Sequence, residues 1–190
     1  IMRALRRQGR ISRSEISSIT GWSKAKASQE IRSLVNKGYL MEIGEGVSQG
    51  GRKPRLLRIN DQLGYIGGID VGATSLDVAL ADVNGSILRR CSEPTDVKLS
   101  PNIVLSRCVA LLLDLLQAQG GTPAQMLGIG IGVPGPVDFS RGVLVAPPLM
   151  PGWENFPVRD LFKQTFLSAF VVVDNDVNIM ALGEQRVGDG

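Results

Sequence analysis

One short segment of the chain combines a carboxylate, a glycine and a hydroxyl in an order that suits phosphate chemistry. Asp70, Gly72 and Thr74 follow an apolar run, so a strand that ends in the carboxylate would lead into a tight turn. Such a turn offers backbone N–H groups and a hydroxyl to a phosphate, and the carboxylate can help to hold a hydrated Mg²⁺. By itself the triplet is more typical of a plain turn, so the phosphate interpretation depends on the segments that follow.

A second polar segment, Asp174-Asn175-Asp176, lies between an apolar run and a helical pattern. The junction of a strand with the next helix is the usual position of a ligand site in an open α/β sheet. Its polar groups can hydrogen-bond sugar hydroxyls, and one carboxylate can accept a hydroxyl proton. Asp176 can also be the N-cap of the helix, and the two roles are compatible. Two rigid Gly/Pro loops, residues 130–138 and 147–154, add weight to a ligand site.

The N-terminal third carries a different chemistry, that of cationic and amide side chains that face outward from a helix. These residue types meet phosphates and base edges in a major groove, and they lie in the first turns of the helix: Lys24, Lys26, Ser28, Gln29 and Arg32. The glycine-rich residues 45–55 include Arg52 and Lys53, as is typical of a wing that enters a minor groove. The alternative is a solvated amphipathic helix pair followed by a basic linker.

Two short helices with a glycine-containing turn between them are predicted to position these side chains. Ser12-Arg-Ser-Glu15 has the form of a capping box, and Ile16 and Ile19 give the first helix a buried stripe. Ser23 is the expected N-cap of the second helix. The core face of that helix is predicted to be Ala27, Ile31, Leu34 and Val35. Strands at 39–43 and 56–59 complete a predicted winged helix-turn-helix over residues 1–60.

Charge divides the chain at the same place. Residues 1–60 carry 13 Lys/Arg and 4 Asp/Glu, whereas residues 61–190 carry 8 and 14, so the net charges are +9 and −6. The helix-turn-helix spacing, the basic wing and this charge together favour binding of double-stranded DNA, and no single lysine decides it.

Composition excludes several chemistries. The chain has no histidine, so Ser-His or Cys-His nucleophilic catalysis, HExxH zinc chemistry and histidine-based pH sensing are excluded within it. Its 2 cysteines cannot build a disulfide framework and suit a reduced cytosol. The longest wholly apolar run is far shorter than the roughly 20 residues that span a bilayer. We therefore expect a cytoplasmic, nucleoid-associated protein with no membrane partner and no metal site within this chain.

From residue 65 the pattern changes to short strands that alternate with helices. Strands are expected at 65–70, 76–81, 87–91, 127–133 and 170–173, helices at 103–116 and 177–186, and the end of a short helix at 161–166. Asn84-Gly85 is a favoured hairpin turn between two of these strands. A β-hairpin meander followed by alternating strands and helices is typical of an α/β domain with a mixed sheet.

Four motifs of this acidic half resemble those of the ROK family (repressors, open reading frames and kinases). They are Gly68-Ile-Asp-Val-Gly-Ala-Thr74, Gly130-Ile-Gly-Val-Pro-Gly-Pro-Val-Asp138, Pro151-Gly-Trp-Glu-Asn155 and Val173-Asp-Asn-Asp-Val-Asn178. In the basic half, Gly50-Gly-Arg-Lys-Pro54 is similar to the repressor branch of the family and not to the stand-alone kinases. The resemblance implies an α/β protein with a winged helix-turn-helix at 1–60. At 61–190 it implies the N-terminal lobe of an actin/hexokinase-like (RNase H-like) ATPase fold.

The resemblance also implies a role for single residues. The phosphate-binding loop would be Asp70, Gly72 and Thr74, the sugar pocket would include Gly135, Asn175 and Asp176, and Asp176 would be the catalytic base in a kinase. Ala73 and Ser75 replace a glycine and a lysine of the family's kinase loop, which disfavours tight ATP binding. ATP and Mg²⁺ are therefore expected only if the protein is a kinase, and zinc is expected in a C-terminal lobe beyond Gly190.

The chain opens inside a helical pattern at Ile1 and closes on Gly188-Asp189-Gly190, so we expect it to be part of a longer protein. The leading hypothesis is a homo-oligomeric (dimeric or tetrameric) repressor that binds a DNA operator. A sugar or sugar phosphate would change its conformational equilibrium. One alternative is an ATP-dependent sugar kinase with a DNA-binding extension. The other is a regulator with a vestigial sugar pocket that responds to a protein partner.

Overall fold

The computed structural model describes residues 1–45, 54–148 and 150–187. The chain divides into two compact units, Ile1–Leu63 and Gly64–Gly190. The division lies three residues after the boundary that the sequence predicts, because the short 3-10 helix Asp61–Leu63 belongs to the first unit. Each unit is described by itself.

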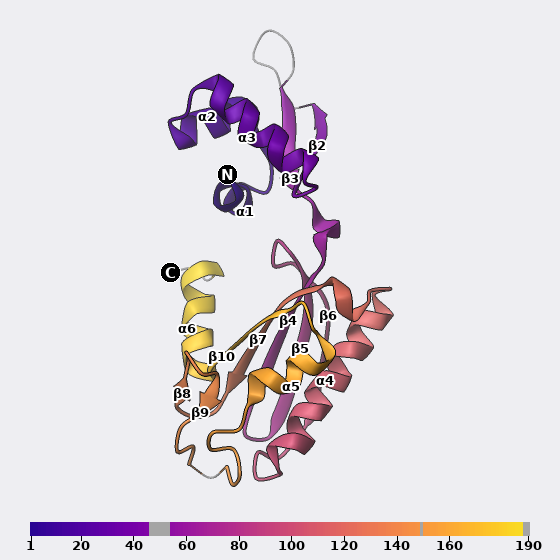
Figure 1. Cartoon of the computed structure of the whole chain (residues 1–190), viewed down its shortest axis with the longest axis vertical. Helices are drawn as coiled ribbons and strands as arrows, with labels where there is room; N and C mark the ends of the chain where they lie inside the picture. Colours follow the sequence, from indigo (N-terminus) through magenta and orange to yellow (C-terminus); the bar gives the residue numbers. More distant parts are fainter. Residues whose placement is uncertain (46–53, 149, 188–190) are drawn as a thin grey trace. The chain divides into compact units, whose positions relative to one another are not determined.

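The first unit is a small helical domain with a three-stranded antiparallel sheet (Figure 1). Its elements are α1 (Met2–Gln8), β1 (Ile11–Ser12), α2 (Arg13–Thr20), α3 (Lys24–Asn36), β2 (Leu40–Glu45) and β3 (Arg55–Ile59). The strand order is β1-β3-β2, so β3 is central. This is the winged helix-turn-helix arrangement that the sequence predicts, with α1 and β1 added in front.

Capping side chains set the helix boundaries of this unit. The Ser12 side chain accepts a hydrogen bond from the Glu15 backbone N–H while the Glu15 carboxylate accepts one from the Ser12 N–H, so the predicted capping box is confirmed. Gly21 ends α2 in the left-handed conformation, with φ of 67°. The Ser23 hydroxyl then accepts the N–H of Lys26 at 3.2 Å and starts α3. Gly21 and Ser23 therefore set the end of one helix and the start of the next.

The core of the first unit is narrower than predicted: Leu34 and Val35 of α3 are only half-buried, and Ile19 of α2 differs most. Ile16, Ala27 and Ile31 are buried as expected, but Ile19 is 51% exposed. Residues three apart on a helix lie about 60° apart around its axis. Since α2 is short and faces the core through Ile16, this rotation carries Ile19 out of the contact. The buried stripe of α2 is thus narrower than the sequence predicts.

The second unit is built on a mixed five-stranded sheet. Its strands are β4 (Tyr65–Val71), β5 (Ser75–Asp82), β6 (Ile87–Pro94), β7 (Met126–Val133) and β10 (Phe170–Asn175), and its helices are α4 (Pro101–Ala118), α5 (Val158–Thr165) and α6 (Asp176–Val187). The strand order is β10-β7-β4-β5-β6, in which β4, β7 and β10 run parallel and β5 and β6 form the antiparallel meander. The mixed α/β sheet predicted from the sequence is confirmed.

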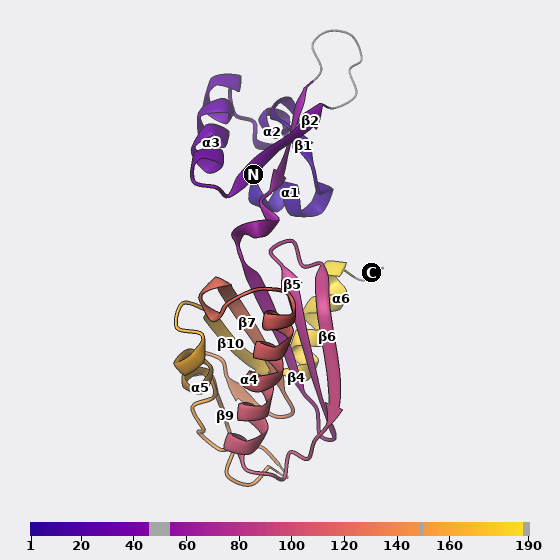
Figure 2. The ribbon, with the colours of Figure 1, turned by 90° about the vertical axis from the view of Figure 1, so that its right-hand side faces the viewer.

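The two faces of this sheet are covered differently. Helices α4 and α5 pack on one face and α6 on the other (Figures 1 and 2). The α4 and α5 face holds the main core, in which Ile69, Ile131 and Val173 of the sheet join Leu105 and Phe162 of the helices. The α6 face carries Asp70 and the glycines of β7. The candidate ligand residues therefore lie on the less covered face.

The structure confirms a hairpin turn that the sequence predicts, but it also contains two very short strands that the sequence does not predict. Asp82 accepts the backbone N–H groups of Asn84 and Ser86, which confirms the hairpin turn between β5 and β6. A two-stranded sheet of β8 (Val137–Asp138) and β9 (Val143–Leu144) was not predicted, because strands of two residues carry no periodic signal.

Among the described helices, α4 is the one long and apolar enough by composition to cross a membrane. In this structure its apolar side, which includes Val104, Cys108 and Leu112, is buried in the core of the second unit. That burial is what a core helix shows.

Candidate functional site

The first turns of α3 form an exposed cationic surface. Lys24, Lys26, Gln29 and Arg32 are exposed and Ser28 is half-buried, so four of the five side chains predicted to contact DNA are free to reach a partner. The helix N-terminus adds backbone N–H groups, and Ser23 occupies one of them. Such a surface can meet phosphates and base edges. The other two predicted contacts, Arg52 and Lys53, lie outside the described residues.

Two partly exposed ion pairs of Glu42 tie the strands of the first unit to α2. The Glu42 carboxylate on β2 accepts hydrogen bonds from Arg13 Nη2 at 2.6 Å and from Arg55 Nη1 at 2.9 Å. These two arginine hydrogen bonds hold the pKa of Glu42 below its usual value. The base of the predicted wing is thereby joined to the start of α2.

In the second unit, a carboxylate of the predicted phosphate loop and one of the predicted sugar pocket line one hollow. Asp70, near the end of β4, and Asp176, the first residue of α6, lie on a cavity of about 270 Å³ with Gly132, Ile179 and Met180. A β-carbon on Gly132 would lie 3.3 Å from Asp70 Oδ1 and 3.5 Å from the Asp176 Cα. The glycine therefore allows the helix and the carboxylate to approach the strand closely.

The electrostatics of this hollow are those of a carboxylate cluster. The pKa of Asp70 is raised, first by partial loss of its hydration and then by the charges of Asp176 and Asp77. Asp77 lies directly opposite Asp70 in the β4–β5 register. Carboxylate oxygens accept hydrogen bonds from hydroxyl groups, so the hollow can hold a hydroxyl-rich ligand.

Asn175 joins this hollow to the Gly/Pro loop after β7. Its side-chain N–H₂ donates to the carbonyls of Gly135 at 3.0 Å and Val133 at 3.4 Å, and its Oδ1 accepts the N–H of Val177 at 3.0 Å. Helix α6 begins at Asp176. The capping side chain is thus that of Asn175, one residue earlier than the sequence suggests. The structure brings Gly135, Asn175 and Asp176 together in this way.

The predicted phosphate loop is the turn between β4 and β5. The Gly72 N–H donates to the Ser75 carbonyl at 2.9 Å, and the Thr74 carbonyl accepts from the Thr95 N–H at 3.0 Å. Thr74 is exposed. Gly72 and Thr74 follow Asp70 in the chain but do not line its hollow. A role for them in binding phosphate stays a prediction.

Sequence reasoning missed two contributors to this face. Asp77 is a carboxylate within an otherwise apolar strand, and strand alternation alone would have placed it on the Asp70 side. The second is a larger adjoining hollow of about 680 Å³, which runs from Asp70 past Gly68 and Gly130 to Arg90 and Cys91. The hollow is open here because Gly68 and Gly130 have no side chain to fill it. The repeated glycines of β7 are the sequence signal that could have indicated this hollow.

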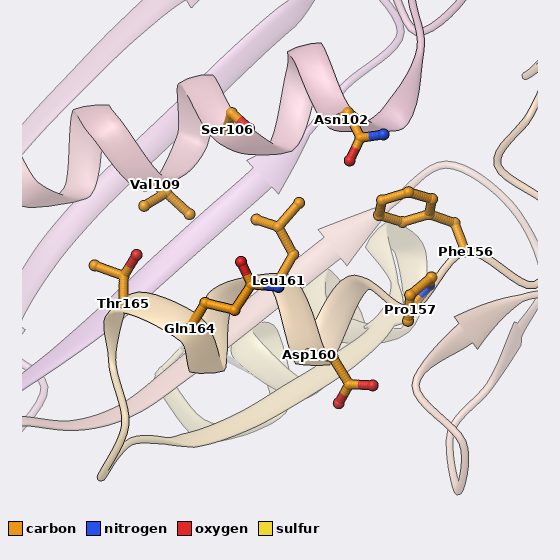
Figure 3. Close-up of a pocket in the computed structure, with 9 residues that line it drawn as sticks. All are labelled: Asn102, Ser106, Val109, Phe156, Pro157, Asp160, Leu161, Gln164 and Thr165. Carbon is orange, nitrogen blue, oxygen red and sulfur yellow. The ribbon is translucent and has the colours of Figure 1, made fainter.

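A further hollow, of about 420 Å³, lies between α4 and α5 (Figure 3). Leu161 of α5 points toward α4, whereas the carboxylate of Asp160 points away from it (Figure 3). Because α4 and α5 pack on the other face of the sheet from α6, this groove is separate from the Asp70 hollow. Across residues 1–45, 54–148 and 150–187, no cluster of three or more Cys, Asp or Glu is placed to hold a metal ion.

Comparison with known families separates the chain into the same two parts. Residues 1–41 match the model of a winged helix-turn-helix DNA-binding family, and residues 66–190 match that of the ROK family. A xylose repressor of Caldicellulosiruptor bescii is 37% identical over 184 residues, which cover 94% of this chain and 44% of the relative. The chain thus spans less than half the length of this curated relative.

Solved structures support the same fold. A ROK family transcriptional regulator, a homologue of the E. coli MLC protein, matches 93% of this chain and 44% of its own length, with a TM-score of 0.68 at 22% identity. A ROK family glucokinase from Streptomyces griseus, solved with glucose and AMPPNP, matches 67% of this chain and 38% of its own length, with a TM-score of 0.56 at 28% identity. The second unit has the actin/hexokinase-like fold predicted from the motifs. The chain belongs to the ROK family and carries a winged helix-turn-helix in front of its ROK domain.

Proposed function

We propose that the full-length protein is a sequence-specific DNA-binding repressor of carbohydrate metabolism, and that a sugar or sugar phosphate bound to the ROK domain changes its operator affinity. One observation carries the proposal: the same chain joins an exposed cationic helix α3 to a ROK domain whose hollow is lined by carboxylates. The similarity to a xylose repressor runs over both parts, which makes xylose the first sugar to test.

The DNA side of the proposal rests on α3. Lys24, Lys26 and Arg32 would neutralise phosphates and release counterions, which drives binding and makes it salt-dependent. Ser28 and Gln29 would reach base edges in the major groove, with Arg52 and Lys53 in the minor groove. Operators of this kind are two-fold, so the protein would act as a homodimer or tetramer in the cytoplasm, at the nucleoid.

The ligand side rests on the hollow at Asp70 and Asp176. Asp70 and Asp176 give the smaller hollow negative charge, and no lysine or arginine is among the described residues that line it, whereas Asp77 and Arg90 line the adjoining larger hollow. Negative charge favours hydroxyl groups over an anionic phosphate. A neutral sugar therefore fits this half of the site better than a sugar phosphate.

The test measures operator binding by the full-length protein with and without sugar. A duplex enriched by in vitro selection is titrated by fluorescence anisotropy in the absence of sugar, with saturating xylose, and with saturating glucose. We expect one sugar to lower the affinity at least about 5-fold, the lower range of allosteric coupling. Unchanged affinity with every sugar would refute the effector role.

Two variants separate the two halves of the proposal. Asp176→Asn should bind the operator as the wild type does but lose the response to sugar. Lys24→Ala combined with Arg32→Ala should weaken operator binding while sugar binding, measured by calorimetry, stays unchanged. If Asp176→Asn weakened operator binding in the absence of sugar, Asp176 would act on the fold and not on the ligand.

A sugar kinase is the second candidate function, because Asp70 and Asp176 line one hollow at the position where kinases of the family carry their catalytic base. Ala73 and Ser75 in the β4–β5 turn oppose it, since they remove a glycine and a lysine from the phosphate loop. ADP release from ATP and xylose or glucose by the full-length protein, abolished in Asp176→Asn, would establish the kinase. We expect no turnover above background.

A further inference from the structure

An aromatic side chain lies directly beside the predicted recognition surface. Trp22 is the residue before the N-cap of α3, and the Lys26 Nζ lies over its ring at 5.0 Å from the centroid. A lysine ammonium within about 6 Å of a tryptophan ring is attracted by the negative face of the π-system. Trp22 is half-buried and Lys26 is exposed, so the pair is open to a partner from one side.

The backbone on both sides of this pair is fixed by short contacts. Ser17 Oγ donates to the Trp22 carbonyl at 2.6 Å, and the Trp22 N–H donates to Thr20 Oγ1 at 3.4 Å. On the other side, the Lys26 N–H donates to Ser23 Oγ at 3.2 Å. These contacts hold the backbone that carries the ring next to the first turn of α3.

Lys26 differs from the other predicted DNA contacts because its side chain lies over an aromatic ring. Lys24, Gln29 and Arg32 have no side-chain hydrogen bond or ion pair with any residue that the structure describes. A free lysine side chain samples many rotamers, and ordering them on binding costs entropy. A side chain that is already held against a ring loses less on binding. The ammonium keeps its N–H donors for a DNA oxygen, because the ring takes none of them by hydrogen bonding.

We propose that Trp22 is a positioning residue for DNA recognition, which holds the Lys26 ammonium at the N-terminal end of α3 for contact with the duplex. This inference rests on the proposed DNA-binding function and adds to it a residue outside the recognition surface. It predicts that the contribution of Lys26 to operator affinity depends on the ring at position 22.

A double-mutant cycle on the full-length protein tests the dependence. Trp22→Leu should weaken operator binding about 2- to 5-fold at fixed salt, the range of an exposed cation–π pair. In a Lys26→Ala background the same substitution should change the affinity less than about 1.5-fold, because non-additivity is the mark of direct coupling. Trp22→Phe, which keeps an aromatic face, should restore most of the loss. Equal loss with and without Lys26 would overturn the proposal and leave Trp22 a structural role only.

Lys24 provides the matched control. It lies in the same turn of α3, and its ammonium does not lie over the Trp22 ring. Trp22→Leu and Lys24→Ala should therefore act additively on operator affinity, and coupling as large as that of Lys26 would contradict the proposed pair.

A second readout needs no DNA. Protons on the Lys26 Cε of the free wild-type protein should resonate upfield of those of Lys24 because of the ring current, and the difference should vanish in Trp22→Leu. An absent upfield shift in the wild type would overturn the pairing. A wild-type protein that binds no operator would refute the DNA-binding function, whereas zero coupling in a protein that binds its operator would refute the Trp22 role alone.

Discussion

The two candidate sites of this chain are assembled over very different distances along the sequence. The recognition surface of the first unit is made by residues 23–32, so that its N-cap and its cations lie within a single stretch of the chain at the start of α3. The two adjoining hollows of the second unit combine Asp70, Asp77, Gly132 and Asp176, which come from β4, β5, β7 and α6. A site of local origin depends on caps and turns, whereas a site of distant origin depends on the sheet and its core.

The largest effect is expected when a buried side chain of the second unit is shortened. Phe162 of α5 is fully buried, and Phe162→Ala should destabilise the second unit by about 3–5 kcal/mol. The sugar-dependent response should be lost with the sheet, while the thermal transition of the first unit stays in place. Circular dichroism melting resolves the two transitions. A parallel loss of stability in the first unit would show that the recognition surface also depends on the second core.

The matching change in the first unit removes a cap. Ser23→Ala deletes the hydroxyl that accepts the Lys26 N–H and should cost about 1 kcal/mol of the stability of that unit. Operator affinity should fall as well, because the first turn of α3 carries the predicted contacts. Ser23→Asp is the control, since aspartate is an equally good N-cap and should restore stability. A neutral effect of Ser23→Ala would mean that packing alone starts the helix.

A smaller effect is expected at the Glu42 ion pairs. The pKa of Glu42 is lowered by Arg13 and Arg55, so its stabilisation is present above the usual value of 4.5 and is lost as the pH falls through the lowered pKa. Glu42→Gln should destabilise the first unit at pH 7 by at most about 1 kcal/mol. The difference between variant and wild type should shrink below pH 4.5, and a difference that grows there would contradict the assignment.

The smallest expected effect is a stabilisation, and it comes from a substitution of Asp70, which lines the hollow. The pKa of Asp70 is raised above 3.8, so the ionised carboxylate opposes folding at neutral pH, and this cost disappears as the pH falls through the raised pKa. Asp70→Asn should therefore stabilise the second unit by a few tenths of a kcal/mol at pH 7. Urea unfolding of the second unit at pH 7 and pH 4 measures it, and destabilisation at pH 7 would show that Asp70 is held by favourable contacts.

The contrast between contacts of neighbouring residues and contacts of distant residues explains which features the sequence could predict. The capping box at Ser12, the N-cap Ser23 and the hairpin at Asn84 each depend on residues at most four positions apart, and all three are present. The exposure of Ile19 was missed because a helical stripe says where a core can form but not how wide it is. The fold of the second unit was reached through motif resemblance, since strand order is not written in any local pattern.

The candidate ligand site shows where such reasoning stops. Asp70 and Asp176 are more than 100 positions apart, and they reach one hollow because β7 pairs in parallel with β4 on one side and with β10, which precedes Asp176, on the other. Strand alternation places Asp77 on the same face as Asp70, but its position directly opposite Asp70 is known only from the β4–β5 register. Both neighbouring side chains turn back to α6: Asn175 Oδ1 accepts the N–H groups of Val177 and Asn178, and Asp176 Oδ1 also accepts that of Val177 at 2.8 Å. Because both have suitable chemistry, the sequence could not show that Asn175 is the N-cap.

The central claim is that the two sites are coupled, and calorimetry of the full-length protein tests it most directly. Xylose is titrated into the free protein and into the protein saturated with its operator duplex. Because coupling is reciprocal, the operator should weaken sugar binding by the same factor by which the sugar weakens operator binding, at least about 5-fold. Equal sugar affinity in the free and DNA-bound protein would contradict the account.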